Sequence, residues 1–445
     1  MDPGTLALRG EGKVEEKIFS IHVLGCKVNQ HDAASLSLAL EKLGLRRAKE
    51  GDSPHIIIVQ TCTVTGEAER QNLQLMRKLK MRNPQALIIA SGCQVQAHGE
   101  ILEGSPWVDL AYPNCKRGEL IEHVAHLCQR SEAPIELREE ELVWGEGLVR
   151  LPGRTRAYLK VQDGCSGACS YCIVPKARGP SRSRPIESIL RTLRAMEESG
   201  TKEVVITGVQ LAAYGMDLDP PFSLPRLIEE IQSFSIPRIR LSSIEPHYLD
   251  KELMDVICSS SKICHHIHIP IQSGSDQILS SMKRPYTARE CREKILWLKE
   301  RIPDLTIGAD IIVGFPGESQ KEFRKTLEFL ESIPWSYLHV FPFSPRPGTE
   351  AYTMERKVDQ GEIKRRASLL RAMSRERRSQ WMESFVGREV EVLLEGPSKR
   401  IHGWMQGKTC NYLKVLIPQG KRREGDMVRV RIEGGLDGEL LGREV

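Results

Sequence analysis

Short apolar runs alternate with amphipathic stretches along most of the chain, and this alternation is typical of α/β proteins. In the N-terminal part, each apolar run has the length of a strand and is bounded by polar or turn residues. These runs predict strands at 18–24, 56–59, 87–90 and 108–111. The stretch 67–81 has helical periodicity and ends at Asn83-Pro84, which is a helix stop signal. We therefore expect an open α/β sheet domain over residues 18–125.

The alternation resumes over residues 151–375, after a charged stretch at 126–150 that lacks periodicity and that we interpret as a linker. Six further strands are predicted, at 157–161, 204–207, 238–242, 267–270, 306–313 and 338–341. Six strands with helices between them indicate a full or partial (β/α) barrel, where functional residues lie at the C-terminal ends of the strands. Polar or glycine-rich residues follow four of these strands, at 207–208, 243–245, 272–274 and 314–318.

The last part of the chain changes character again. A helix predicted over residues 362–380 carries two acidic residues, Glu362 and Glu376, against seven basic ones: Lys364, Arg365, Arg366, Arg371, Arg375, Arg377 and Arg378. Beyond it, the segment 428–432 alternates apolar and polar residues with a period of two, as a half-buried strand does. Glycine-rich turns separate several such segments, so we expect a small β barrel over residues 378–445.

Composition places the chain among globular proteins. Of its 445 residues 40% are apolar, and no apolar run approaches the roughly 18 residues that a membrane span needs. The first 17 residues contain four acidic side chains and no long apolar stretch, which argues against a secretory signal. We expect a cytoplasmic protein with no membrane partner. The net charge of +5 is mild, so only its local distribution bears on nucleic-acid binding.

The 12 cysteines are more informative than the charge. In a reducing compartment cysteines bind metal, take part in catalysis or pack in the core, and rarely form disulfides. Six of them are scattered, and we interpret these as small buried apolar residues: Cys115, Cys128, Cys258, Cys264, Cys291 and Cys410. The other six form two constellations.

The first constellation is Cys165, Cys169 and Cys172, in a loop just after a predicted strand. A structural zinc site needs a fourth ligand, and no further Cys or His follows until His247. Three thiolates suit a [4Fe–4S] cluster with one iron open to a ligand from outside the protein. Tyr171 lies between the last two cysteines, where its ring can pack against a planar group at that iron. The alternatives are a structural zinc and a chance cluster.

The second constellation is distant in sequence. Cys26, Cys62 and Cys93 each follow a predicted strand of the N-terminal sheet. Because ligands bind at the carboxyl edge of open α/β sheets, three cysteines in equivalent positions predict a site there. A single cysteine in such a place would be read as a core residue.

The string Asp163-Gly-Cys-Ser-Gly-Ala-Cys-Ser-Tyr-Cys-Ile-Val-Pro175, with Ala177-Arg178-Gly179 and Ser181-Arg182-Ser183-Arg184, resembles the cluster loop of the radical S-adenosylmethionine methylthiotransferases. Members of that family add a methylthio group to tRNA or to a ribosomal protein. The resemblance covers about 18–445, and the tail, with Gly407-Lys408-Thr409 and Asn411-Tyr412-Leu413-Lys414-Val415, is similar to a TRAM domain. It implies an N-terminal cluster domain, a radical SAM partial barrel and an RNA-binding barrel.

The resemblance implies two [4Fe–4S] clusters and S-adenosylmethionine as cofactors. The catalytic cluster would be held by Cys165, Cys169 and Cys172, and the second by Cys26, Cys62 and Cys93. One electron would cleave S-adenosylmethionine to a 5′-deoxyadenosyl radical, and sulfur held at the second cluster, once methylated, would be transferred. Motif matches give the predicted cofactor contacts: Tyr171, Gly208, Gln210, Ser243, Glu245, Gln272, Ser273 and Asp310. Partners would be tRNA, an electron donor and a sulfur donor.

Three strings are most similar to the branch that acts on threonylcarbamoyladenosine in tRNA: Gly25-Cys26-Lys27-Val28-Asn29-Gln30, Arg240-Leu-Ser-Ser-Ile-Glu-Pro246 and His339-Val-Phe-Pro-Phe-Ser-Pro-Arg346. The chain departs from the family at Gln60, where Asn is usual, and at Gln94-Val95, where Tyr-Ala is usual. Both departures bear on the hydrogen bonds around the N-terminal cluster.

Basic residues near the cluster loop, Arg178, Arg182 and Arg184, together with the basic helix, favour a nucleic-acid substrate. The predicted reaction is methylthiolation of carbon 2 of N6-threonylcarbamoyladenosine next to the anticodon. The alternatives are isopentenyladenosine in tRNA and an aspartate of a ribosomal protein. A hypothesis from another class is a non-catalytic iron–sulfur or zinc RNA-binding protein.

Overall fold

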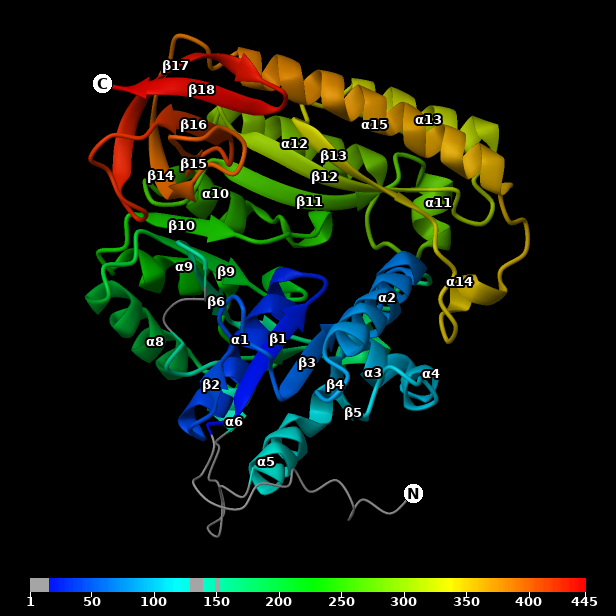
Figure 1. The fold of residues 1–445 in the computed structure, drawn as a ribbon. Coiled ribbons are helices and arrows are strands. Elements are labelled where there is room, and N and C mark those ends of the chain that lie inside the picture. The colour runs from blue at the N-terminus through cyan, green and yellow to red at the C-terminus, as the bar shows by residue number, and fades with distance from the viewer. Residues whose placement is uncertain (1–15, 129–138, 149–152) are drawn as a thin grey trace. The chain divides into compact units, whose positions relative to one another are not determined.

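The computed structural model describes residues 16–128, 139–148 and 153–445. The chain forms two compact units (Figure 1). The first comprises residues up to 148 together with 163–167 and 172–180, and the second comprises the rest. The predicted linker at 126–150 and the first 17 residues lie partly outside the described residues. Among the described helices, none is long and apolar enough to cross a membrane.

A parallel sheet of five strands forms the centre of the first unit. The strands are β1 (Ile18–Val23), β2 (Arg46–Arg47), β3 (Ile56–Thr61), β4 (Leu87–Gly92) and β5 (Leu110–Pro113), in the order β2-β1-β3-β4-β5. Strands β3 and β4 are buried at every position. Burial on both faces explains why their sequences are continuous apolar runs. The predicted open α/β sheet is confirmed, although β5 begins two residues after the predicted 108.

Helices cover both faces of this sheet. Helices α1 (Lys27–Lys42), α5 (Arg117–Leu127) and α6 (Glu139–Leu142) share a core with Ile56 and Ile58, while α2 (Gly66–Arg82), α3 (Cys93–His98) and α4 (Glu100–Glu103) share another with Ile57 and Val59. Alternate residues of β3 thus face opposite layers. Leu142, in the stretch predicted to be a linker, is buried in the first of these cores. Helix η2 (Asn114–Lys116) precedes α5, and α7 (Val174–Arg178) packs against α3.

Six parallel strands of the second unit form a partial barrel. They are β6 (Ala157–Lys160), β9 (Glu203–Thr207), β10 (Arg238–Leu241), β11 (His266–Gln272), β12 (Thr306–Val313) and β13 (Tyr337–Pro342). They make two three-stranded sheets, β10-β9-β6 and β11-β12-β13. Isolated bridges at Ile239↔Ile263 and Ser243↔His268 join the two halves. The short strands β7 (Gln162–Asp163) and β8 (Arg182–Ser183) pair separately.

Helices pack around these strands, and most of them contribute to one continuous apolar core, while Ala351 of α14 belongs to a smaller one. In chain order they are α8 (Ile186–Glu198), η3 (Leu211–Ala213), α9 (Leu224–Gln232), η4 (Pro246–Tyr248), α10 (Lys251–Ser259), α11 (Asp276–Ser281), α12 (Ala288–Arg301), α13 (Gln320–Glu331), α14 (Glu350–Thr353) and α15 (Gln360–Glu383). Helix α12 starts at a capping box in which Thr287 and Glu290 satisfy each other's backbone N–H groups. Repetition of strand and helix is the reason that the sequence predicted a (β/α) arrangement.

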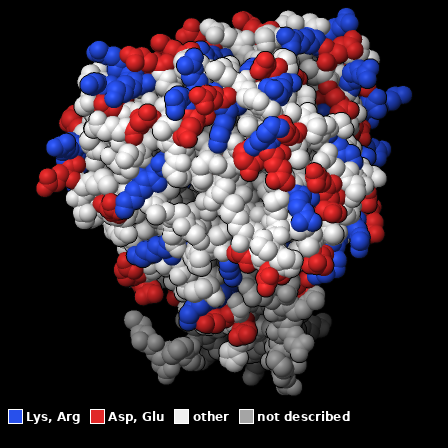
Figure 2. All heavy atoms as spheres, turned by 180° about the vertical axis from the view of Figure 1, so that it is seen from behind, with Lys and Arg blue, Asp and Glu red and all other residues white. Residues whose placement is uncertain are grey.

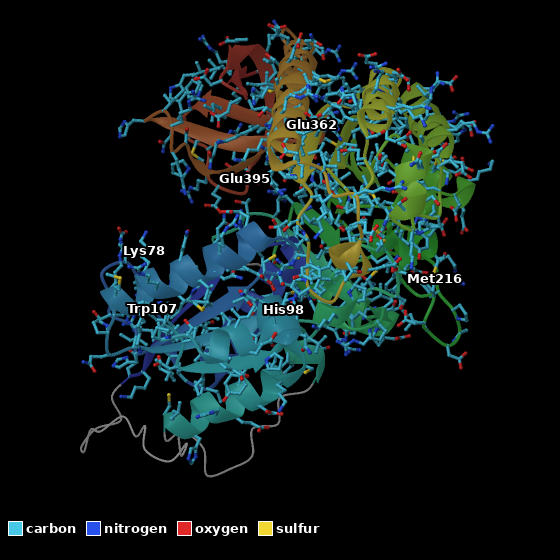
Figure 3. The ribbon with its side chains drawn as sticks, turned by 90° about the vertical axis from the view of Figure 1, so that its right-hand side faces the viewer. Lys78, His98, Trp107, Met216, Glu362 and Glu395 are labelled. Atoms are coloured by element: carbon cyan, nitrogen blue, oxygen red, sulfur yellow. The ribbon has the colours of Figure 1, made fainter. Side chains whose placement is uncertain are left out.

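A closed barrel ends the chain. Its strands are β14 (Glu389–Pro397), β15 (Trp404–Thr409), β16 (Lys414–Pro418), β17 (Met427–Leu436) and β18 (Glu439–Glu444), in the order β14-β15-β16-β18-β17. Met382 of α15 contributes to the barrel's own core. The labels of Glu362 on α15 and Glu395 on β14 locate this part of the second unit in Figure 3. The predicted small C-terminal β barrel is confirmed.

Arg240 ties the C-terminal barrel to strand β10. Its Nε donates to Glu203 at 2.7 Å, and its Nη2 donates to the carbonyl of Thr409 at 3.2 Å. The side chains of Arg240 and Glu203 are fully buried. Arg240 opens one of the strings that resemble the threonylcarbamoyladenosine branch, and in the structure it is a packing residue.

Candidate functional site

The three strand-end cysteines of the first unit come to one edge of its sheet. Cys26 lies between β1 and α1, Cys62 follows β3, and Cys93 begins α3 directly after β4. Because β1, β3 and β4 are adjacent and parallel, their carboxyl ends meet at the same edge. Electrostatic interactions link the Cys62 thiol to those of both Cys26 and Cys93. The convergence predicted from the sequence is therefore present.

Gly25 is held close to Cys62. Its φ is +103°, in the region that favours glycine, and a Cβ there would lie 2.9 Å from both Cβ and Sγ of Cys62. Cys62 and Cys93 are each 7% exposed, whereas Cys26 is exposed. Burial raises the pKa of the Cys62 thiol to about 11 and also raises that of Cys93. Both thiols are protonated at neutral pH unless a cation such as a cluster iron compensates their charge.

The donor set fits a sulfur-ligated cluster better than a single zinc ion. Zinc at about 2.3 Å from each thiolate needs sulfurs about 3.8 Å apart. Among the described residues, the three His, Cys, Asp or Glu ligand atoms that lie within 4.8 Å of one another belong to His268, Asp310 and His339, and the strand-end cysteines are more widely spread. A multi-iron cluster spans that larger separation and needs only three protein thiolates.

A network of side-chain amides underlies these cysteines. Asn29 Nδ2 donates to the carbonyl of Thr61 at 3.1 Å, and Gln60 Nε2 donates to Asn29 Oδ1 at 3.2 Å. Asn72 Nδ2 donates to the Cys62 carbonyl at 2.7 Å and to Gln94 Oε1 at 2.6 Å. The two glutamines at which the chain departs from the family thus take part in hydrogen bonds that fix the Cys62 backbone. Sequence reasoning missed Asn72, whose only signal is its place in a polar helix.

Arg178 is an internal residue of the first unit and cannot present its charge to RNA. Its guanidinium donates to Asp32 at 2.9 Å, to Asp163 at 2.9 Å and to Asn29 at 3.2 Å, and its side chain is 4% exposed. Asp32 also pairs with Arg117 at 2.7 Å. The expectation that Arg178 neutralises phosphate is therefore wrong, because the fold uses the charge for buried carboxylates.

The expectation of phosphate neutralisation is also wrong for Arg184. It is fully buried in the second unit, where it donates to Ser188 Oγ at 3.0 Å and to Thr192 Oγ1 at 2.6 Å. Arg182, two residues earlier, is exposed. Arg184 lies just beyond strand β8, which ends at Ser183, so the alternation of that strand does not place it on the exposed face of Arg182.

The loop that holds the first constellation has no helix or strand between β7 and α7. Cys165, Cys169 and Cys172 are all partly exposed, unlike Cys62 and Cys93. In the first unit, the Cys165 N–H donates to the Gly179 carbonyl at 3.0 Å. Gly164 has φ +71°, and a Cβ there would lie 1.9 Å from the carbonyl oxygen of Pro180, so only glycine allows this approach.

Cys169 belongs to the second unit, where Arg284 Nη1 donates to its Sγ at 3.1 Å. Arg284 also lies over the Tyr286 ring, 4.9 Å from its centroid. The Arg284 guanidinium thus places a positive charge beside this sulfur. The ring of Tyr171 packs edge-on against Phe315, with centroids 6.5 Å apart. Sequence reasoning missed Arg284, which lies more than 100 residues from the loop.

Most of the predicted cofactor contacts lie at or near the carboxyl ends of the barrel strands, whereas Asp310 lies in mid-strand and Tyr171 in the cysteine loop. Gly208 lies where a Cβ would be 2.8 Å from Gln162 Oε1, and the Gln210 N–H donates to the same Oε1 at 2.8 Å. Gln272 has φ +73°, a strained conformation for a non-glycine residue. Ser273 is fully buried, with its hydroxyl 3.3 Å from Thr326 Oγ1. Ser273 thus has local hydrogen bonds, whereas the strained Gln272 has a conformation typical of ligand sites.

Glu245 is a half-buried acid whose Oε2 atom is closed to solvent. Burial raises its pKa to about 7, and its Oε2 has no hydrogen-bond partner among the described residues. Ser243, two residues earlier, is exposed and lies 2.8 Å from His268 Nδ1. Asp310 lies in mid-strand, 3.1 Å from His268 Nε2 and 3.3 Å from His339 Nδ1. Sequence reasoning assigned no role to either histidine, although His339 opens one of the branch-like strings.

The basic helix exists as α15, and its charges divide into two sets. Five of the seven predicted basic residues are exposed: Lys364, Arg365, Arg371, Arg375 and Arg378. Arg366 is buried and pairs with Glu318 at 2.7 Å, and Arg377 donates to the Ile333 carbonyl at 2.8 Å. On the face in Figure 2, basic and acidic side chains are interspersed, so net charge does not by itself mark an RNA surface there.

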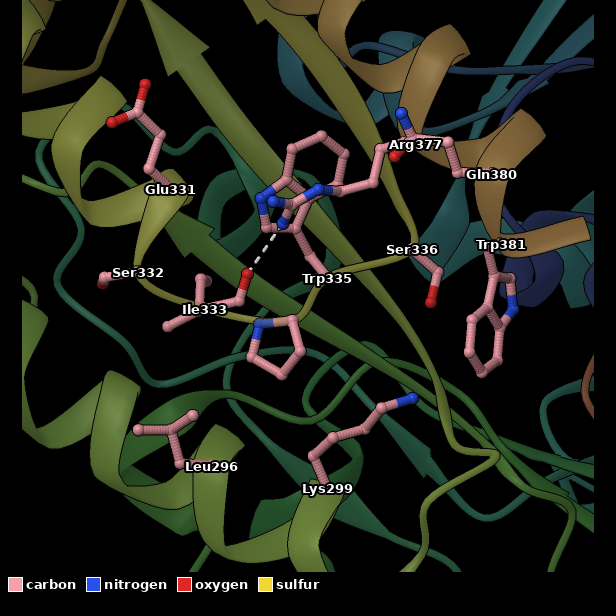
Figure 4. Close-up of a pocket in the computed structure, with 11 residues that line it drawn as sticks. Leu296, Lys299, Glu331, Ser332, Ile333, Trp335, Ser336, Arg377, Gln380 and Trp381 are labelled. Atoms are coloured by element: carbon pink, nitrogen blue, oxygen red, sulfur yellow. Dashed lines mark hydrogen bonds between the residues drawn. The ribbon is translucent and has the colours of Figure 1, made fainter. Parts of the chain in front are cut away.

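A surface groove of about 570 Å³ lies beside Arg377 (Figure 4). Residues of α12, α13, α15 and the loop before β13 line it. The Arg377 guanidinium is 4.6 Å from the centroid of the Trp335 ring, and Lys299 Nζ is 4.0 Å from that of Trp381. Burial lowers the pKa of Lys299 to about 8. None of the predicted cofactor contacts lines this groove.

The six scattered cysteines were expected to be buried apolar residues, and this holds for Cys128, Cys264 and Cys291. Cys115 is exposed, so the expectation is wrong there. Cys258 and Cys410 are half-buried. Cys410 accepts a hydrogen bond from the His265 N–H at 3.2 Å, and a hydrogen bond from Cys264 lowers the Cys410 pKa to about 6.

Comparison with protein families divides the chain into three matched parts. Residues 18–112 match the Uncharacterized protein family UPF0004, residues 159–330 match the Radical SAM superfamily, and residues 383–444 match the TRAM domain. The first match contains all three strand-end cysteines, and the second contains the cysteine loop. The third covers the C-terminal barrel.

Curated relatives match over nearly the whole chain. The threonylcarbamoyladenosine tRNA methylthiotransferase MtaB of Aquifex aeolicus (strain VF5) is 35% identical over 93% of this chain and 99% of its own length. MtaB of Bacillus subtilis (strain 168) is 32% identical over 93% of each chain. A tRNA-2-methylthio-N(6)-dimethylallyladenosine synthase of Desulfitobacterium hafniense (strain Y51) is 33% identical over 97% of this chain and 98% of its own.

Among solved structures, the radical S-adenosylmethionine methyltransferase TsrM from Kitasatospora setae, with cobalamin and a [4Fe-4S] cluster bound, has a TM-score of 0.54. The alignment covers 76% of this chain and 74% of that one at 14% identity. This likeness supports the fold, with an α/β sheet domain and a radical SAM core.

Proposed function

The chain belongs to the radical S-adenosylmethionine tRNA methylthiotransferases, and we propose that it methylthiolates carbon 2 of N6-threonylcarbamoyladenosine next to the anticodon. The observation that carries the proposal is the presence, in one chain, of strand-end cysteines at one sheet edge and of a second trio in the cysteine loop. The branch rests on the three branch-like strings and on the 35% identity to the Aquifex aeolicus MtaB. A dimethylallyladenosine synthase is 33% identical to this chain, so isopentenyladenosine in tRNA is the second candidate substrate.

We assign Cys165, Cys169 and Cys172 as ligands of the catalytic cluster and Cys26, Cys62 and Cys93 as ligands of the second. The C–H bond at carbon 2 of an adenine is too inert for a side-chain base or nucleophile. When bound, a [4Fe–4S] cluster with S-adenosylmethionine supplies one-electron chemistry that can activate such a bond. The reaction also consumes an electron and a sulfur atom, so the enzyme needs an electron donor and a sulfur donor as partners.

The chain's own residues hold and orient these groups. The amide network of Asn29, Gln60, Asn72 and Gln94 fixes the backbone at Cys62. Arg284 donates a hydrogen bond to the Sγ of Cys169 and helps to hold this side chain. At the barrel ends, the absence of a side chain at Gly208 lets the backbone approach a bound cofactor closely. The backbone at Gln272 has an unusual conformation, which is also typical of cofactor contacts. Gln210, Ser243, Glu245, Ser273, Tyr171 and Asp310 complete the set of predicted cofactor contacts.

Exposed basic residues of α15 and the TRAM barrel are the proposed tRNA-binding elements. Five exposed cations along one helix can contact successive phosphates, which is the sequence-independent part of RNA binding. An enzyme that modifies a base must take it out of the stack, and loop nucleotides of tRNA are splayed out at low cost. These elements therefore supply the affinity for tRNA, whereas residues at the barrel ends select the adenosine that is modified.

Nucleoside mass spectrometry tests the proposal. A host that lacks its own methylthiotransferases is made to express this chain, and its tRNA is digested and compared with that of a host expressing the Cys165→Ala variant. Methylthiolated threonylcarbamoyladenosine, absent from the variant host, is the expected product. Methylthiolated isopentenyladenosine would overturn the assignment to the threonylcarbamoyladenosine branch but would still support tRNA methylthiolation. If neither product forms although both clusters are loaded, this result would contradict tRNA methylthiolation and direct the search to a ribosomal protein.

A further inference from the structure

Two histidines and one aspartate converge inside the partial barrel of the second unit. They come from three adjacent strands: His268 from β11, Asp310 from β12 and His339 from β13. One ligand atom from each lies within 4.8 Å of the other two. No cysteine takes part, and Asp310, which the sequence predicted as an S-adenosylmethionine contact, is here a candidate metal ligand instead.

Asp310 differs from three buried acids of this chain that pair with arginine. Asp32, Glu203 and Glu318 each pair with an arginine at 2.7 Å. The Asp310 side chain is only 20% exposed, yet its ion-pair partners among the described residues are the two imidazoles alone. A carboxylate that lies beside two imidazoles, with no arginine or lysine of the described chain paired to it, belongs to a donor set that metal ions use in proteins.

The spacing of the ligand atoms suits a metal ion. His268 Nε2 and His339 Nδ1 lie 3.1 Å and 3.3 Å from the same Asp310 oxygen, Oδ1. Ligands at about 2.0–2.1 Å from a tetrahedral zinc ion are separated by about 3.3–3.4 Å. Neither His268 Nε2 nor Asp310 Oδ1 has a partner in hydrogen-bonding geometry within the described parts of the chain. Two buried acceptor atoms at this distance, which do not bond to each other, leave room for a shared cation.

Ser243 sets the tautomer that such a site requires. Its hydroxyl lies 2.8 Å from His268 Nδ1, across an isolated bridge between the two halves of the barrel. If Nε2 carried the proton, its N–H would be expected to donate to the nearby Asp310 Oδ1, and that geometry is absent. The proton therefore belongs on Nδ1 and is donated to Ser243, which leaves the Nε2 lone pair available. Metal-ligating histidines in proteins are held in this way.

We propose that His268, Asp310 and His339 bind one divalent first-row metal ion of the zinc type. Two imidazoles and a carboxylate are typical ligands of such ions, and three protein ligands leave a position for water or an oxygen ligand. That position is accessible because the His339 side chain is 54% exposed. The rings of Tyr337 and Phe341 lie 5.3 Å and 6.4 Å from that of His339 and form an aromatic wall beside it.

Metal content and metal environment test this site without tRNA or S-adenosylmethionine. The full-length chain, loaded with iron and sulfide, is dialysed anaerobically against micromolar Zn²⁺, and zinc and iron are measured in the same sample. We expect one zinc per chain at unchanged iron content. Zinc absorption spectroscopy should show N and O neighbours at about 2.0–2.1 Å and no sulfur at about 2.3 Å. No bound zinc, or zinc with sulfur neighbours, would overturn the proposal.

Three variants and a control sharpen the test. Asp310→Asn and His339→Ala should abolish zinc binding, and Ser243→Ala should weaken it about 10- to 100-fold because the tautomer is no longer fixed. His402→Ala removes an exposed histidine of the same unit and should bind zinc like the parent. His339 is half exposed, so its replacement leaves a folded chain to measure. Retention of zinc by both His339→Ala and Asp310→Asn would show that another set of residues holds it, and that result too would overturn the proposal.

Discussion

Arg178 Nη2 lies 2.9 Å from Asp32 Oδ2, and both side chains are closed to solvent although 146 positions separate them in the sequence. Asp32 is on α1 and Arg178 ends α7, so the pair fixes the segment after the cysteine loop against the helix that follows Cys26. The same guanidinium also contacts Asp163, just before the loop. Arg178 thus stabilises the cluster environment instead of binding phosphate.

Loss of one partner from this pair should strongly destabilise the first unit. Asp32→Asn leaves Arg117 without the carboxylate that it pairs with and leaves Arg178 with Asp163 alone, and an unpaired buried charge costs about 3–5 kcal/mol. Chemical unfolding followed by a probe in the first unit should show this loss. Lys116→Ala, which breaks an exposed pair with Glu119 at 3.0 Å, is the control and should change stability by about 1 kcal/mol or less. Equal effects would contradict the structural role.

Replacement of the two sets of cysteines should have different effects on the reaction. Replacement of Cys165, Cys169 or Cys172 by Ala should abolish reductive cleavage of S-adenosylmethionine, whereas replacement of Cys26, Cys62 or Cys93 should stop sulfur insertion while some cleavage survives. Either set should lower iron from about eight to about four atoms per chain. Cys115→Ala, at an exposed cysteine of the first unit, should leave iron and cleavage unchanged. Equal loss of cleavage in both sets would refute this division.

Gly25→Ala should disturb Cys62 directly. A Cβ at this position meets Cβ and Sγ of Cys62 at 2.9 Å, in a backbone conformation that is strained for alanine. We expect the variant to lose the iron assigned to the first unit. Gly51→Ala is the matched control, because Gly51 has a similar φ of +90° but no atom within 4 Å of the added Cβ. If both variants keep full iron content, Gly25 does not position Cys62.

The stability of the second unit should depend on pH through Glu245. Its folded-state pKa is about 7, and an unfolded Glu titrates near 4.3, so the native state binds more protons between these values. The favourable contribution is therefore complete below about pH 4 and is lost as pH rises through 7. Glu245→Gln should raise the unfolding temperature relative to the parent more at pH 8 than at pH 5. A difference that does not vary with pH, as expected for the exposed control Glu230→Gln, would contradict this assignment.

Helix α15 should contribute to tRNA binding through its exposed cations only. Each of Lys364→Ala, Arg375→Ala and Arg378→Ala should weaken tRNA binding and lower the slope of log affinity against log salt by up to about 0.9. Arg366→Ala should instead destabilise the protein, since Arg366 is buried against Glu318. Arg292→Ala, an exposed cation of α12, is the control. An unchanged salt slope in the α15 variants would place the RNA elsewhere.

The sequence by itself determined the layers of the molecule. Apolar runs of strand length predicted β3 and β4, and the period-two segment at 428–432 predicted β17, because local alternation reflects which face of an element is buried. It also placed a cysteine directly after each of three predicted strands. Parallel strands end at one edge, so three strand-end cysteines had to converge once the sheet was recognised.

Tertiary structure alone decided how charges and polar groups are paired. Arg178 and Arg184 are basic residues in a basic stretch, and nothing local reveals that both lie inside the protein. The same holds for Asp310, whose imidazole neighbours come from strands 42 and 29 residues away. The hydrophobic face of a helix or strand can be predicted from residues that are close in the sequence. The partner of a buried charge depends instead on which distant strands and helices pack together.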